Sequence, residues 1–236
     1  MCRDAVQQQR FFSLEAFFHM LSQLLDPKRT PLELETPPYL VLRKTAGYEV
    51  RRYQPFVVAE APVAIAATSS SSSGGGGSAV SSPASRGGVP AFFALVDYIS
   101  GGNEAQQRYL MTTPVFTDTD GRMQFMIGSG AGTAGVNGAG AAGENGVLPR
   151  ASGRAAAGGV VTRTLAGEIF AARAFSGVAD DQHAAQEATE LRRQLLAHGQ
   201  VPAGDGWLLA RYNDPSVLPP FRRNEVLIPV ADFQLW

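Results

Sequence analysis

The chain has 236 residues, with 20 Lys and Arg against 21 Asp and Glu, for a formal net charge of −1. A balance this close to zero gives no long-range attraction to a phosphate backbone, so nucleic acid is not an expected partner. The single cysteine, Cys2, excludes a disulfide framework and a cysteine-based zinc site, and is typical of a reducing compartment. No run of about 18 apolar residues predicts a membrane-spanning helix.

Residues 1–32 predict an amphipathic helical extension. Its apolar residues recur with the spacing of one helix face, at Phe11, Leu14, Phe18, Leu21 and Leu25. We expect this helix to pack on the domain, with docking on a membrane, a lipid droplet or a partner protein as the alternatives. The segment does not have the pattern of a secretory signal peptide.

Two tracts rich in Gly, Ser and Ala interrupt the remainder, at about residues 68–88 and 129–159. Such tracts bury little apolar surface, and neither contains the GxxxxGK[ST] pattern of a phosphate-binding loop. They predict disordered inserts in surface loops, where added length costs little entropy. Without them, the chain from 33 to 236 predicts one domain with one core.

The first half of this domain predicts three strands, a helix and a hairpin. The strands are expected at residues 39–42, 48–53 and 56–63, the helix from Pro90 to about Gly101, and the hairpin at residues 114–117 and 123–127. Within the helix, the spacing places Phe92, Val96 and Ile99 on one face, which Phe93 and Leu95 broaden.

The second half repeats that order, with a strand at residues 163–175, a helix at about 180–198 and strands at 207–212 and 224–230. Each half alone would expose the apolar face of its sheet, so the two halves are expected to close on each other. The pattern predicts an α+β fold, in which one antiparallel sheet or open barrel carries two main helices.

Four segments of this core resemble the SOUL/haem-binding protein family of plants and algae: YEVRRYQPFVVAE, FFALVDYISGGN, MTTPVF and RRNEVLIPV. The order and spacing of the segments match the family once the inserts are removed. The resemblance implies a distorted antiparallel β-barrel made of two pseudo-symmetric halves. It also implies reversible, non-catalytic binding of haem or a related tetrapyrrole, and a chloroplast location in the stroma, at the thylakoid or at the plastoglobule surface, with the cytoplasm as the alternative.

The resemblance places the ligand near the first helix. A porphyrin needs a flat apolar surface, together with cations or donors for its two propionates. Carried onto this chain, the apolar contacts are Phe92, Phe93, Leu95, Val96, Ile99 and Met111. Arg108 is the expected propionate partner, followed by Arg222 and Arg223; the alternative roles of these arginines are a surface charge and a cross-strand partner for Glu225. Packing of the helix on its own sheet is the alternative role for the apolar residues.

We expect no metal site and no catalytic residues. The three histidines, His19, His183 and His198, lie outside the first helix and the MTTPV segment, and are interpreted as surface residues. Met111, Tyr98 and Tyr109 are the alternative axial ligands to a haem iron. No GxSxG, HExxH or CxxC pattern occurs. The alternative functions are binding of another amphipathic ligand, such as a bilin or a lipid, and an interaction module at a lipid surface.

Overall fold

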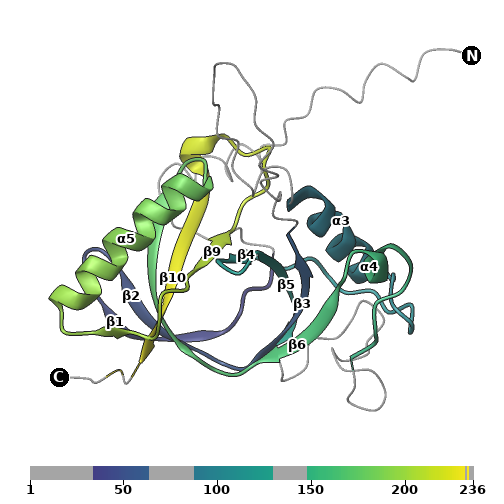
Figure 1. Cartoon of the computed structure of the whole chain (residues 1–236), viewed down its shortest axis with the longest axis horizontal. Helices are drawn as coiled ribbons and strands as arrows, with labels where there is room; N and C mark the ends of the chain where they lie inside the picture. Colours follow the sequence, from purple (N-terminus) through teal and green to yellow (C-terminus); the bar gives the residue numbers. More distant parts are fainter. Residues whose placement is uncertain (1–33, 64–87, 130–147, 232, 234–236) are drawn as a thin grey trace, which may run out of the picture.

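The computed structural model describes residues 34–63, 88–129, 148–231 and 233 (Figure 1). The predicted N-terminal helix, the first insert up to residue 87 and the second insert up to residue 147 therefore lie outside the described residues. The described parts contain a ten-stranded sheet in which every pair of strands is antiparallel.

The sheet runs in the order β1-β2-β7-β10-β9-β4-β5-β3-β6, and β8 pairs with one end of β10. Its strands are β1 (Tyr39–Lys44), β2 (Glu49–Tyr53), β3 (Phe56–Pro62), β4 (Val115–Asp118), β5 (Arg122–Ser129), β6 (Val161–Leu165), β7 (Ile169–Ser176), β8 (Val201–Pro202), β9 (Leu208–Arg211) and β10 (Arg223–Ala231). The helices are α3 (Gly88–Ile99), α4 (Gly153–Ala157) and α5 (Asp181–Ala197), with a short 3-10 turn, η1, at Pro219–Phe221.

This order contains an internal two-fold repeat. In the first half β4, β5 and β3 lie side by side, and in the second half β9, β10 and β7 lie side by side, with β4 and β9 paired at the centre. The helix α3 follows β3 just as α5 follows β7. The predicted α+β distorted barrel made of two pseudo-symmetric halves is confirmed (Figure 1).

Successive side chains of each strand point to opposite faces of the sheet, and both faces carry buried apolar clusters. The outer face is covered by helices: α3 and α4 pack over one part of it and α5 over the other. The inner face forms a third cluster to which no helix contributes, built from Tyr53, Phe56, Val58, Phe116, Met126, Ala172, Ala210, Tyr212 and Leu227. Figure 1 shows the same arrangement, with the helices outside a curled sheet.

Two predicted boundaries are corrected. The prediction that disorder continues to residue 159 is wrong for residues 148–159, because they include α4, and Ala155 of α4 is fully buried against α3. The Asp97 carboxylate of α3 fixes α4 by accepting a hydrogen bond from the Ala155 backbone N–H at 3.0 Å. The predicted strand 163–175 is two strands, which bend at Gly167, where an added Cβ would lie 2.6 Å from the Tyr53 carbonyl oxygen.

Candidate functional site

The side of α3 that faces away from the sheet is apolar and exposed. Val89 is 53% exposed, Phe92 37% and Phe93 52%, and Val96 is half-buried beside them. We call these four residues the α3 outer face. The Phe92 and Phe93 rings meet edge to face with centroids 6.0 Å apart, and Phe92 also packs on the buried Phe125 ring at 5.4 Å. The exposed aromatic surface is therefore anchored to the core through the contact between Phe92 and Phe125.

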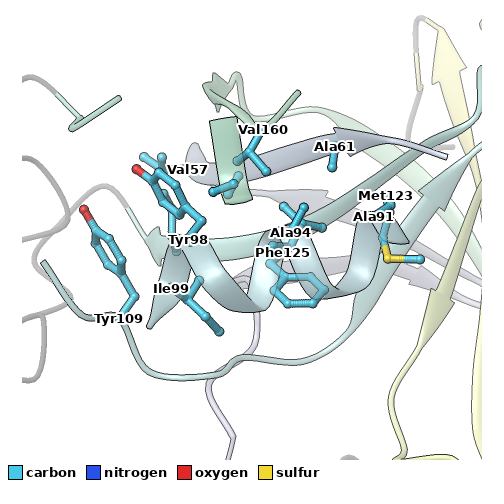
Figure 2. Packing of buried hydrophobic residues seen from close by; sticks show 14 of the residues in the cluster. Val57, Ala61, Ala91, Ala94, Tyr98, Ile99, Tyr109, Met123, Phe125 and Val160 are labelled. Atoms are coloured by element: carbon cyan, nitrogen blue, oxygen red, sulfur yellow. The ribbon is translucent and has the colours of Figure 1, made fainter. Parts of the chain in front are cut away.

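The opposite side of α3 lies in the core. Its buried residues include Ala91, Ala94, Leu95, Tyr98 and Ile99, which pack on β3 and β5 (Figure 2). Leu95 is 0% exposed and Ile99 is 7% exposed, so neither offers surface to a ligand in this conformation. The predicted single face of Phe92, Val96 and Ile99 is therefore corrected: Phe92 and Phe93 face outward, while Leu95 and Ile99 support the helix from below.

The segment that follows α3 brings Arg108 and Met111 to the C-terminal end of the helix. The Tyr109 backbone N–H donates to the Ile99 carbonyl at 2.8 Å, which fixes the segment against that end. Arg108 is exposed and forms no ion pair within the described parts of the chain, whereas Met111 is half-buried against the α3 core. Ile99, at that end of α3, lies about 10 Å along the helix axis from Phe92, at a rise of about 1.5 Å per residue.

Tyr98 and Tyr109 are not available as axial ligands. Their rings stack inside the core with centroids 5.9 Å apart, and the Tyr98 hydroxyl donates to the Pro149 carbonyl at 2.8 Å. Burial raises the pKa of both phenols, which opposes the tyrosinate form that binds iron. Figure 2 shows both rings within the apolar cluster.

Both described histidines lie on α5, in the other half of the molecule. His183 is in the first turn of α5, where its ring packs against Phe175 at 4.8 Å, and its backbone N–H donates to the Asp180 carboxylate. His198 is at the opposite end of α5, and its Nδ1 lies 2.8 Å from the Tyr48 hydroxyl. His19 lies outside the described residues. In the parts of the chain that are described, no three His, Cys, Asp or Glu residues are grouped to hold a metal ion.

The two arginines predicted as secondary propionate partners, Arg222 and Arg223, have structural roles. Arg223 is 7% exposed and donates to Glu225 at 2.7 Å inside the barrel. Arg222 donates to the Val217 carbonyl at 2.7 Å and so fixes the loop before β10. Neither is placed to bind a ligand at α3. Arg108 is the predicted cation that stays exposed near the helix.

Glu225 is the centre of a buried polar network, of which the sequence predicted only the pairing with Arg222 or Arg223, as their alternative role, and neither the burial nor the partners Arg51 and Tyr212. It is 0% exposed, and its carboxylate accepts from Arg51 at 2.7 and 3.1 Å, from Arg223 at 2.7 Å and from the Tyr212 hydroxyl at 2.7 Å. Burial alone would raise the pKa of Glu225, but the hydrogen bonds and positive charges of Arg51 and Arg223 hold it below its usual value. The one signal in the sequence was a charged residue inside the apolar run NEVLIPV.

The MTTPV segment also has a structural role. Thr112 donates to the Met126 carbonyl at 2.6 Å, within the first half. Thr113 donates to the Tyr212 carbonyl at 3.0 Å and so ties the first half to the second. These two threonines of the MTTPV segment therefore hold the barrel together.

A family model described as SOUL heme-binding protein matches residues 34–229, most of the chain. The chain belongs to the SOUL family. Haem or tetrapyrrole binding is accordingly the function that the family indicates for it. No curated protein matches the chain.

Several solved structures are similar to this chain at very low identity. An uncharacterized conserved protein from Listeria innocua is 8% identical, with a TM-score of 0.45, covering 89% of this chain and 96% of that one. A hydrolase from the same organism is 10% identical, with a TM-score of 0.43 and coverage of 80% and 94%. A putative transcription regulation protein from Staphylococcus aureus is 10% identical, with a TM-score of 0.36 and coverage of 78% and 97%. Similarities this low carry no information on activity.

Proposed function

We propose that this SOUL protein binds haem or a related tetrapyrrole on the α3 outer face, without turnover, for transport, buffering or storage. The observation that carries the proposal is the exposure of two adjacent phenylalanines and a valine on a helix whose buried contacts with the sheet come mainly from other residues. Large exposed apolar surfaces on soluble domains commonly mark binding sites.

The outer face has the chemistry that a macrocycle requires. Phe92 and Phe93 offer aromatic surface for the flat ring, and Val89 and Val96 extend it along the helix. The one charged side chain of α3, Asp97, is engaged with the N-terminus of α4 and does not interrupt this surface. Arg108, in the segment at the C-terminal end of the helix, would pair with a propionate, and Met111 of the same segment is a ligand type that haem iron accepts.

Binding on this face would depend on apolar docking more than on coordination. Covering the exposed parts of Phe92, Phe93 and Val89 contributes roughly 1 kcal/mol for each side chain, because full burial of such a side chain is worth about 1.5–3 kcal/mol. The same surface would also suit the surface of a lipid membrane or a bilin, and the experiment must distinguish these alternatives from haem binding. Chloroplast location and lipid contact through residues 1–32 remain predictions.

The test is a titration of the full chain with ferric haem, followed in the Soret region. Phe93→Asp places a charge on the outer face, and Leu196→Asp is the matched control, because Leu196 is 60% exposed on α5. We expect saturable binding in the parent chain and in the control, and affinity at least tenfold weaker in Phe93→Asp, which corresponds to about 1.4 kcal/mol. Equal affinity in all three proteins would overturn the proposed site.

Two further measurements define the mode of binding. Arg108→Gln is expected to weaken haem binding a few-fold at low salt and to have no effect at high salt, because an exposed ion pair is screened. Sedimentation with anionic lipid vesicles tests the alternative. If Phe93→Asp abolishes vesicle binding while the parent chain gives no saturable Soret change, the outer face is a lipid surface and not a haem site.

A further inference from the structure

A second candidate site lies inside the barrel, on the face of the sheet that no helix covers. It is a cavity of about 250 Å³, and both halves of the molecule contribute to its wall. Five aromatic side chains line it: Tyr53, Phe56, Phe116, Phe170 and Trp207. Leu165, Leu208 and Leu227 complete the apolar part of the wall. None of these residues belongs to the α3 outer face.

The charged groups of the cavity are mainly acidic. Asp118, Asp120 and Glu168 line it together with one base, Arg163. The Arg163 guanidinium already forms an ion pair with the buried Glu60 at 3.1 Å, so its charge is compensated. None of the three acids Asp118, Asp120 and Glu168 forms an ion pair within the described parts of the chain, so a ligand that enters the cavity meets net negative charge.

Asp118 is the acid best placed to meet a ligand. Strand β4 alternates, so Asp118 lies on the same inner face as Phe116, while Thr117 between them faces the other way and bonds Arg211. One carboxylate oxygen accepts from the Arg122 backbone N–H at 2.8 Å, and no ion pair to Asp118 occurs in the described residues. Burial, with a contribution from the Asp120 charge, raises the pKa of Asp118. A cation beside it would relieve that cost.

The volume limits the size of the ligand. A cavity of about 150 Å³ accepts benzene, and sites for drug-sized ligands begin at about 300 Å³. At about 250 Å³ the space between its walls suits one ring with a substituent or two fused rings. An occupant of that size differs from the tetrapyrrole proposed for the α3 outer face.

We propose that the barrel cavity binds a small aromatic cation of one or two rings, with its ring among the aromatic side chains and its charge next to Asp118. Aromatic faces attract cations, and this attraction grows when the cation leaves water. A carboxylate at the rim adds a fixed partner of opposite charge. The SOUL chain would then have two ligand sites on opposite faces of one sheet, with ligands of different size and charge.

The test uses Trp207 as the reporter. The chain has two tryptophans, so the Trp236→Phe substitution makes Trp207 the single source of tryptophan fluorescence. N-methylquinolinium is the probe, and quinoline at pH 8 is the same bicyclic ring without the charge. We expect saturable quenching by N-methylquinolinium and affinity for quinoline about fivefold weaker. The anion 1-naphthoate should not bind.

Asp118→Asn is the decisive variant. Asparagine keeps an oxygen that can accept from the Arg122 backbone N–H, so the turn is preserved while the charge is lost. It should weaken N-methylquinolinium binding about fivefold and leave quinoline binding unchanged. Quenching that does not saturate, equal binding of 1-naphthoate, or an unchanged affinity in Asp118→Asn would each overturn the proposal.

The two sites can fail independently. Phe93→Asp should leave the quenching of Trp207 by N-methylquinolinium unchanged, because Phe93 does not line the cavity. Asp118→Asn should leave the haem titration unchanged. If Phe93→Asp weakened the binding of both ligands, there would be one shared site, and the barrel cavity would not be a separate one.

Discussion

The two main helices hold equivalent places in the two halves and differ on the side that faces away from the sheet. Both bury a stripe of alanine and large apolar residues against the sheet. The free side of α5 carries an ion pair, Arg193 with Glu190 at 2.7 Å. The free side of α3 carries Val89, Phe92 and Phe93. The fold requires only the buried stripe, so an apolar free side on one helix alone indicates a function.

The barrel interior shows a second contrast, between two buried glutamates. Glu60 in the first half pairs with Arg122 at 2.8 Å and Arg163 at 3.1 Å, and both arginine side chains are 51% exposed. Glu225 in the second half pairs with Arg51 and Arg223, whose side chains are 5% and 8% exposed. The arginine partners of Glu60 are therefore partly hydrated, whereas those of Glu225 are shielded from water.

The largest expected effect is on the free energy of unfolding, when the charge of each buried glutamate is removed in turn. Glu225→Gln would leave the guanidinium groups of Arg51 and Arg223 buried without a counter-charge, which typically costs about 3–5 kcal/mol of unfolding free energy. Glu60→Gln frees two half-exposed arginines and should cost roughly 1 kcal/mol. Urea unfolding of both variants measures the difference. Equal losses would mean that the burial of the arginine partners does not control the cost.

The pH dependence of stability should show the same network, with a smaller effect. The pKa of Glu225 is lowered in the folded protein, so its contribution is fully present above the unfolded value, about 4.3, and is lost as the pH falls through the folded value. The difference in unfolding free energy between the parent chain and Glu225→Gln should therefore shrink between pH 7 and pH 3. A difference that stays constant over this range would contradict the lowered pKa.

Alternation and turn residues were enough to predict the fold, because each half repeats a local pattern. The strand and helix positions follow from periodicity, and the Asp120-Gly121 turn of the first hairpin is present, with a φ of +77° at Gly121. The orientation of α3 was not predictable in this way. Apolarity alone predicts that Phe92 is buried in preference to Ala91 and Ala94. However, the segment after α4 approaches α3 so closely that a Cβ on Gly158 would collide with Ala94, so small residues are required at this contact.

Contacts between distant segments account for the rest of what was missed. Arg51 and Glu225 are 174 residues apart in the chain and meet only because β2 and β10 both flank β7. The α4 helix lies in a tract whose composition is typical of disorder, and its order depends on Asp97 of another helix. The barrel cavity is enclosed by strands of both halves, so no single stretch of the sequence carries its pattern.

The smallest expected effect concerns the histidines of α5. If the α3 outer face alone binds haem, His183→Ala and His198→Gln should leave the position and midpoint of the Soret change as in the parent chain. Tyr48→Phe is the direct comparison for His198→Gln, since each removes one partner of the 2.8 Å contact that joins the C-terminal cap of α5 to the segment before β2. Both should cost about 1 kcal/mol of stability at most. A Soret band that moves in His183→Ala or His198→Gln would mean that α5 supplies an axial ligand. The haem would then belong to the charged helix, and the contrast between the free sides of the two helices would not indicate the binding site.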